Sequence, residues 1–164
     1  MSVVVGKRKE SSYEAVWRAK KLNEEMVDLC IRRLGIKDMD HLMRRRFEYK
    51  ASRYHNVDEQ VSMIQEAKKT LMQYVNGILT RTRIAFATKP DSLEHCDIRI
   101  KLIEESEMYC ELLIGKMQNV IDIFQTDINA YKPYVKMIDE EIYYLRKWRK
   151  KTNGIRKKFL RGDF

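Results

Sequence analysis

The sequence contains few of the residues that make turns. Its 164 residues include six glycines and two prolines, while 44% are hydrophobic and 35% are charged. Sheets need many turns, so this composition favours long helices joined by short links. A chain of this length suits one domain and can bury about 70% of the surface that its unfolded form exposes. We therefore expect a single all-α domain.

Cysteines and long apolar runs are also scarce. Cys30, Cys96 and Cys110 form no C-x-x-C pair and fall within helical patterns, which argues against a disulfide framework or a zinc site. No stretch approaches about 18 uninterrupted apolar residues, and residues 1 to 12 are short and basic, unlike a signal peptide. These features predict a cytoplasmic protein without a membrane span or a cofactor.

Motifs for catalysis are missing. The chain has no G-x-x-x-x-G-K-[ST], no G-x-G-x-x-G and no G-x-S-x-G, the starting motifs of phosphate-loop, dinucleotide and hydrolase sites. A di-iron bundle needs Glu-x-x-His on two helices, and only Asp38-x-x-His41 has a related spacing. The other histidines, His55 and His95, show no convergent partners. We expect a protein that is not an enzyme, with no catalytic residue and no metal site.

Apolar residues recur at helical spacing in four long segments, which predicts helices over about 12–35, 58–87, 92–125 and 128–151. The predicted end signals are Ser12 and Gly35 for the first helix, a capping box of Asp91 and Glu94 for the third, and Asp127 with Pro133 for the fourth. The apolar positions that define them are Val16, Ala19, Met26, Cys30 and Leu34; Val61, Ile64, Leu71, Val75, Ile78 and Ala85, broken at Lys68 and Thr82; Cys96, Ile100, Ile103, Cys110, Ile114, Met117, Ile121 and Phe124, broken at Glu107; and Ile128, Tyr131, Val135, Ile138, Ile142 and Leu145.

Four long helices joined by mostly short links predict an antiparallel up-down four-helix bundle. Residues 36–57 have poor periodicity and are interpreted as an extra helical insertion between the first two helices. The expected organisation is a basic arm over 1–11, the bundle over 12–151 and a basic tail over 152–164.

The charge is concentrated at one end. Nine of the 33 lysines and arginines follow Leu145, where Asp163 is the only acid, so this segment carries +8 of the net charge of +9. In a helix, no acid lies three or four residues before the first five of these cations. Such a cluster attracts polyanions through phosphate contacts. The predicted nucleic-acid contacts are Arg146, Lys147, Arg149, Lys150, Lys151, Arg156, Lys157 and Lys158, joined at the same pole by Lys7, Arg8 and Lys9.

Three other features near or outside this cluster have two interpretations each. Trp148 can stack on a base or complete the apolar seam, and its spacing from Leu145 favours packing. The run Arg44 to Arg46 lies among aromatic residues but has acids nearby in a helix, which favours a solvated face. The acidic run is interpreted as a solvated face that partly pairs with Lys101, or as a patch that docks on a neighbouring subunit. Its members are Glu104, Glu105, Glu107 and Glu111.

Both ends of the chain contain short sequence segments that resemble those of a known family. They are Met1-Ser2-Val3-Val4, Gly6-Lys7-Arg8-Lys9-Glu10-Ser11, Met137-Ile138-Asp139-Glu140-Glu141-Ile142 and Leu145-Arg146-Lys147-Trp148-Arg149-Lys150. The sequence resembles the Avd-like four-helix-bundle proteins, the accessory variability determinants of diversity-generating retroelements. Two segments depart from that pattern: the long connection 36–57 and the turn Ile84 to Pro90.

The resemblance implies a non-enzymatic, basic, pentameric bundle of bacterial or phage origin. Such a protein binds a reverse transcriptase and its template RNA or cDNA, and supports mutagenic retrohoming. Three alternatives remain at this point. They are a related bundle encoded by an intervening sequence of a ribosomal RNA gene, a protein-interaction scaffold with a basic end, and a membrane-surface tail that inserts Ile155, Phe159, Leu160 and Phe164.

Overall fold

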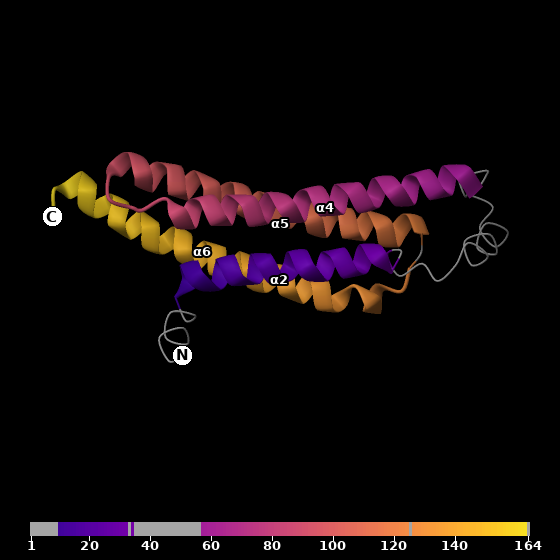
Figure 1. Ribbon diagram of the computed structural model, residues 1–164. Helices are drawn as coiled ribbons and strands as arrows, with labels where there is room; N and C mark the ends of the chain where they lie inside the picture. Colours follow the sequence, from indigo (N-terminus) through magenta and orange to yellow (C-terminus); the bar gives the residue numbers. More distant parts are fainter. Residues whose placement is uncertain (1–9, 33, 35–56, 125, 164) are drawn as a thin grey trace, which may run out of the picture.

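The computed structural model describes residues 10–32, 34, 57–124 and 126–163. The described chain forms four long helices, and a short 3-10 helix precedes the last of them. They are α2 (Ser11–Ile31), α4 (Val57–Ala87), α5 (Leu93–Phe124), η2 (Ile128–Ala130) and α6 (Lys132–Arg161). Successive long helices run in opposite directions (Figure 1), and α2 and α5 each pack against both α4 and α6. The all-α four-helix bundle is confirmed. The predicted insertion over 36–57 lies outside the described residues apart from residue 57, where α4 begins.

The buried stripe of α2 differs from the predicted one. Its core residues are Ala15, Ala19, Leu22, Met26 and Leu29, whereas the predicted Val16 and Cys30 are only half-buried. With the stripe centred on Ala19 and Leu22, the side chain of Arg18 reaches Glu140 on α6. The N-cap is Glu10, in an extended conformation, so Ser12 lies inside the helix and not before it as predicted.

The end of α2 is fixed by a contact with the loop that precedes α6. The helix ends at Ile31, and Leu34 follows it with a φ of 58°, a left-handed conformation that costs a leucine free energy. Leu34 is nevertheless fully buried, and its carbonyl oxygen accepts a hydrogen bond of 2.6 Å from the hydroxyl of Tyr131. Gly35, the predicted end of the helix, lies outside the described residues.

The cores of α4 and α5 follow the predicted heptads but not every position within them. Thr82 of α4, predicted to interrupt the apolar seam, lies on the buried face. Its hydroxyl can be buried there because it donates within the helix to the carbonyls of Ile78 and Leu79. Val61, predicted as core, is 39% exposed. In α5, Ile100, Ile114 and Ile121 were predicted as core residues but are half-buried. The buried residues between Cys96, Ile103, Cys110, Met117 and Phe124 instead include Ser106, Leu113 and Val120, each one residue before a position of the predicted pattern.

The capping residue of α5 is Ser92 and not the predicted box of Asp91 and Glu94. The Ser92 hydroxyl accepts a hydrogen bond of 3.1 Å from the backbone N–H of His95, which satisfies one of the free donors at the helix start. Asp91 instead pairs with the His95 ring at 2.5 Å, and this ring lowers the pKa of the Asp91 carboxyl.

The last helix is longer than predicted. Asp127, predicted to cap the last long helix, instead caps η2 by accepting from the N–H of Asn129, and the N-cap of α6 is Tyr131. Pro133 lies in the first turn of α6, as predicted. Ile128, however, is 53% exposed and lies before α6 begins. The helix continues past Lys151 to Arg161, so most of the predicted tail is helical. Its last turns project beyond the start of α2 at one pole of the bundle (Figure 1).

The core contains a carboxyl group without a partner. Glu141 of α6 is fully buried, and neither of its side-chain oxygens has a hydrogen-bond partner among the residues that the structure describes. Burial raises the pKa of Glu141 well above its ordinary value, while Arg18 on α2 lowers it and Glu14 raises it. Arg18 itself binds two other carboxylates, those of Glu14 at 3.2 Å and Glu140.

Candidate nucleic-acid interface

The basic residues of α6 divide into two sets according to the face on which they lie. At 100° per residue, the core residues of this helix occupy one side. The arginines Arg149 and Arg156 lie at the edge of that side, next to α5. Five lysines lie on the opposite side of the helix, within an arc of about 120°. We call this set the lysine face: Lys147, Lys150, Lys151, Lys157 and Lys158.

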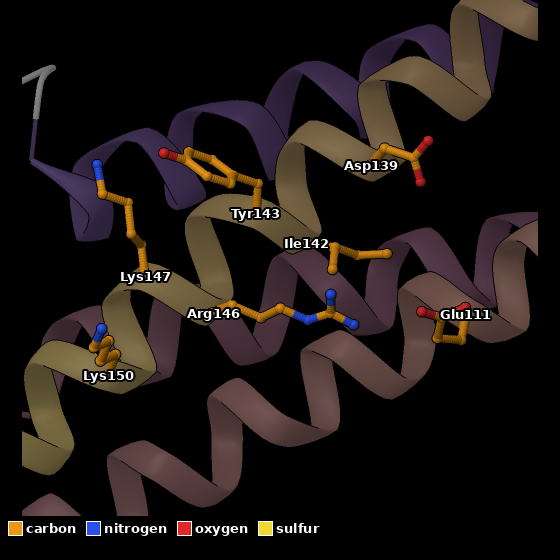
Figure 2. Close-up of a pocket in the computed structure, with 7 residues that line it drawn as sticks. All are labelled: Glu111, Asp139, Ile142, Tyr143, Arg146, Lys147 and Lys150. Carbon is orange, nitrogen blue, oxygen red and sulfur yellow. The ribbon is translucent and has the colours of Figure 1, made fainter.

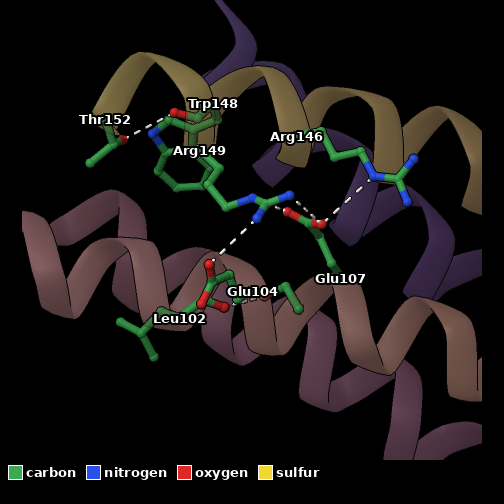
Figure 3. Close-up of polar contacts among 8 residues, drawn as sticks. Leu102, Glu104, Glu107, Arg146, Trp148, Arg149 and Thr152 are labelled. Atoms are coloured by element: carbon green, nitrogen blue, oxygen red, sulfur yellow. Dashed lines mark hydrogen bonds and ion pairs between the residues drawn. The ribbon is translucent and has the colours of Figure 1, made fainter. Parts of the chain in front are cut away.

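The arginines are paired with acids of α5. Arg149 binds Glu107 through two contacts, Nε to Oε1 at 2.8 Å and Nη2 to Oε2 at 3.2 Å, and reaches Glu104 at 3.4 Å (Figure 3). Arg156 binds Asp97 at 2.5 Å. Arg146 contacts Glu107 at a longer 3.7 Å and stays 61% exposed. These contacts tie α6 to α5 along one edge of the bundle.

Glu107 is the most buried of the paired acids, with a side chain that is 15% exposed. Burial raises the pKa of Glu107, and the nearby guanidinium groups of Arg149 and Arg146 partly offset this effect. The planar guanidinium of Arg149 brings one nitrogen to each oxygen of this carboxylate and donates a hydrogen bond to Oε2.

No acid within α6 offsets the basic cluster, as predicted, but acids of α5 pair with three of its arginines. Three members of the acidic run of α5 pair with arginines of neighbouring helices and not with Lys101, whereas Glu111 is exposed. Glu104 and Glu107 pair with α6, and Glu105 binds Arg81 of α4 at 2.8 Å. Arg149 and Arg156, both predicted as nucleic-acid contacts, hold helices together.

The lysine face is exposed to solvent. Among the residues that the structure describes, none of its five ammonium groups forms an ion pair, and neither does Arg161 in the last turn of α6. The five lysines span about 17 Å along the helix. Gly154 lies between them, and a Cβ added to it would meet no atom within 4 Å. The surface is thus an open row of cations.

A pocket of 450 Å³ adjoins the first turns of the lysine face (Figure 2). Lys147 and Lys150 lie toward one end, the carboxylates of Glu111 and Asp139 lie toward the other, and the Arg146 side chain extends from α6 toward Glu111. Along α6, Ile142 and Tyr143 lie between Asp139 and Arg146. Sequence reasoning missed this pocket, because it depends on how α5 and α6 pack.

Trp148 belongs to the core, as its spacing predicted. Its side chain is 1% exposed, and the guanidinium carbon of Arg99 lies 5.1 Å from the ring centroid. Arg99 also donates a hydrogen bond of 3.0 Å to the carbonyl of Ala85 at the end of α4. The indole is therefore closed off from a base in solution.

Other predicted site residues lie outside the described part of the chain. These are Lys7, Arg8 and Lys9, and the run from Arg44 to Arg46. In the part that the structure does describe, no group of three or more His, Cys, Asp or Glu residues is placed to hold a metal ion.

No described helix has the length and apolar character needed to cross a membrane. The chain matches no family model, and the searches of curated proteins and of solved structures likewise found no match.

Proposed function

We propose that this chain is a non-enzymatic accessory protein that binds nucleic acid through the lysine face of α6. The observation that carries the proposal is the row of five exposed lysines, none of which forms an ion pair with an acid in the described part of the chain. Lysine ammonium groups act as point charges on phosphates and position a polyanion without reading its sequence. Arg161 adds a sixth cation at the end of the helix.

The retroelement role extends this proposal along the resemblance at the two ends of the chain. The nucleic acid is then template RNA or its cDNA, and the protein partner is a reverse transcriptase. A homo-oligomer, a pentamer by the same resemblance, would repeat the lysine face around a ring. A gene for a reverse transcriptase beside a pair of imperfect repeats is the expected genomic setting, and a location in a ribosomal RNA gene would count against it.

The salt dependence of binding tests the proposal directly. If five or six phosphates meet the lysine face and Arg161, the log–log slope of affinity against salt for a single strand is about −4. Fluorescence anisotropy with a labelled single-stranded RNA across a salt series measures this slope. A slope near zero would overturn the proposal.

A charge-matched pair of variants locates the contact. Lys150→Gln, Lys157→Gln and Lys158→Gln together remove three phosphate contacts, which lowers the magnitude of the slope by about two. The control removes three exposed lysines elsewhere, Lys20, Lys69 and Lys136, by the same substitution. Equal losses in the two triple variants would show that net charge, and not the lysine face, governs binding.

A protein-interaction scaffold is the second candidate function, favoured by a pocket of 440 Å³ between α5 and α6. Its lining is mainly apolar and includes Ile121, Val135 and Ile128, which is 53% exposed. Under this function the chain captures a protein partner and no RNA. Ile128→Lys would then abolish capture of the partner in a pull-down, while the lysine variants would have no effect on it.

A further inference from the structure

An exposed aromatic ring stands at the start of the lysine face. Tyr143 of α6 is 56% exposed, on the side of the helix that carries the lysines. It lies one helical turn before Lys147, whose ammonium nitrogen is 5.5 Å from the centroid of the Tyr143 ring. The ring and the first cation of the face therefore form one surface, seen beside the pocket in Figure 2.

The ring of Tyr143 has a fixed neighbour. Tyr144 meets it edge to face, with centroids 5.1 Å apart and an interplanar angle of 82°. Tyr144 is in turn held by the guanidinium of Arg18, 4.8 Å from its centroid, and Arg18 is anchored to Glu14 and Glu140. A ring braced in this way loses little conformational entropy when a flat group stacks on it.

The charges of the adjoining pocket are separated in the manner that a nucleotide requires. Lys147 and Lys150 lie at one end and attract phosphate, whereas Asp139 and Glu111 at the other end repel it. The carboxylates therefore favour an uncharged part of the ligand at their end, while the Arg146 guanidinium lies along the way to Glu111. Tyr143 and Ile142 offer that part an aromatic and an apolar surface.

We infer that Tyr143 is a stacking platform for a base of a single-stranded nucleic acid whose phosphates lie on Lys147 and Lys150. This inference rests on the proposed function and adds the class of nucleic acid to it. A single strand presents the faces of its bases to an aromatic ring, whereas a duplex keeps them stacked on one another. Duplexes then bind through phosphates alone.

The test compares two single strands that differ only in their bases. One is a labelled DNA strand of about 12 nucleotides, and the other is the same backbone with every base replaced by an abasic site. Tyr143→Leu removes the aromatic face but keeps an apolar side chain. It should weaken binding of the base-bearing strand on the order of tenfold and leave the abasic strand unchanged. Tyr143→Phe keeps the stacking face and should bind both strands like the parent protein.

Each outcome separates this inference from the proposed function. If Tyr143→Leu binds the base-bearing strand as tightly as the parent while the triple lysine variant loses affinity, the stacking role is overturned and polyanion binding stands. If neither strand binds the parent protein, the proposed function itself fails. If Tyr143→Leu instead changes the sedimentation coefficient of the free protein, the ring belongs to an interface between copies of the chain, and the inference is likewise overturned.

Discussion

Replacing the buried carboxyl of Glu141 should make the protein more stable. The side chain is fully buried among core residues of α6, and neither oxygen has a hydrogen-bond partner in the described part of the chain. An unpaired polar group in such a place costs about 1–3 kcal/mol of the free energy of unfolding. Glu141→Met removes this penalty at similar volume. Arg18 stays paired, because Glu14 and Glu140 still bind it.

The same carboxyl should make stability depend on pH. Burial raises the pKa of Glu141 in the folded state, so the folded protein keeps a proton that the unfolded chain releases above its ordinary value of 4.5. The contribution of Glu141 to the free energy of unfolding is therefore highest below pH 4.5 and falls as pH rises. The loss is up to about 1.4 kcal/mol per pH unit, until the folded carboxyl ionises as well. Glu141→Gln cannot ionise and should lack this part of the slope.

Urea unfolding followed by far-UV circular dichroism at several pH values between about 5 and 8 measures both effects. The relevant quantity is the difference between variant and parent at each pH, because other groups such as Glu107 also titrate. Glu24→Gln, on an exposed position of α2, is the control and should follow the parent. The reasoning is refuted if Glu141→Met destabilises the protein, or if Glu141→Gln keeps the full pH slope of the parent.

Two further predictions concern α4, α5 and α6. Gly154→Ala should raise the free energy of unfolding by about 1 kcal/mol, because the added methyl group meets open space. Gly77→Ala should raise it less or lower it, because the added Cβ would lie 3.1 Å from the Tyr109 ring. Arg149→Met should lower the free energy of unfolding by about 1–2 kcal/mol, because the half-buried Glu107 loses its hydrogen bond and its nearest ion pair. The affinity of Arg149→Met for RNA should stay near the parent value, and a loss as large as that of the triple lysine variant would contradict the division between arginines and lysines.

The helices were predictable because their signals are local. The predicted limits of α4 and α5 fall within one residue of the observed ones, since Pro90 and the cap at Ser92 act through neighbouring backbone atoms. The heptad positions of α5, from Cys96 to Phe124, were predictable for the same reason. The buried residues that lie between these heptad positions were not predictable. Whether Ser106 or Glu107 is buried, for example, depends on the rotation of α5 about its axis relative to its neighbours.

The end of α6 was mispredicted because its signals were interpreted by charge alone. Lysine and arginine are good helix formers and suit the negative end of the helix dipole. Gly162, with a φ of 70°, ends the helix at Arg161, and the N–H of Asp163 donates to the carbonyl of Lys158. This arrangement is the glycine C-cap that the sequence already contained. The burial of Glu141 could also have been predicted from the sequence, because this residue lies three positions after Ile138 and four before Leu145, on the same side of the helix.

The division of cations on α6 explains how so basic a helix can also be a structural element. A helix with nine uncompensated cations would repel itself and the rest of a basic protein. Here the guanidinium groups of Arg149 and Arg156 are neutralised by acids of α5, at the edge where α6 must pack. The remaining repulsion is confined to the lysine face, where a polyanion would relieve it. Binding and stability should therefore respond to different residues of the same helix, lysines for the first and arginines for the second.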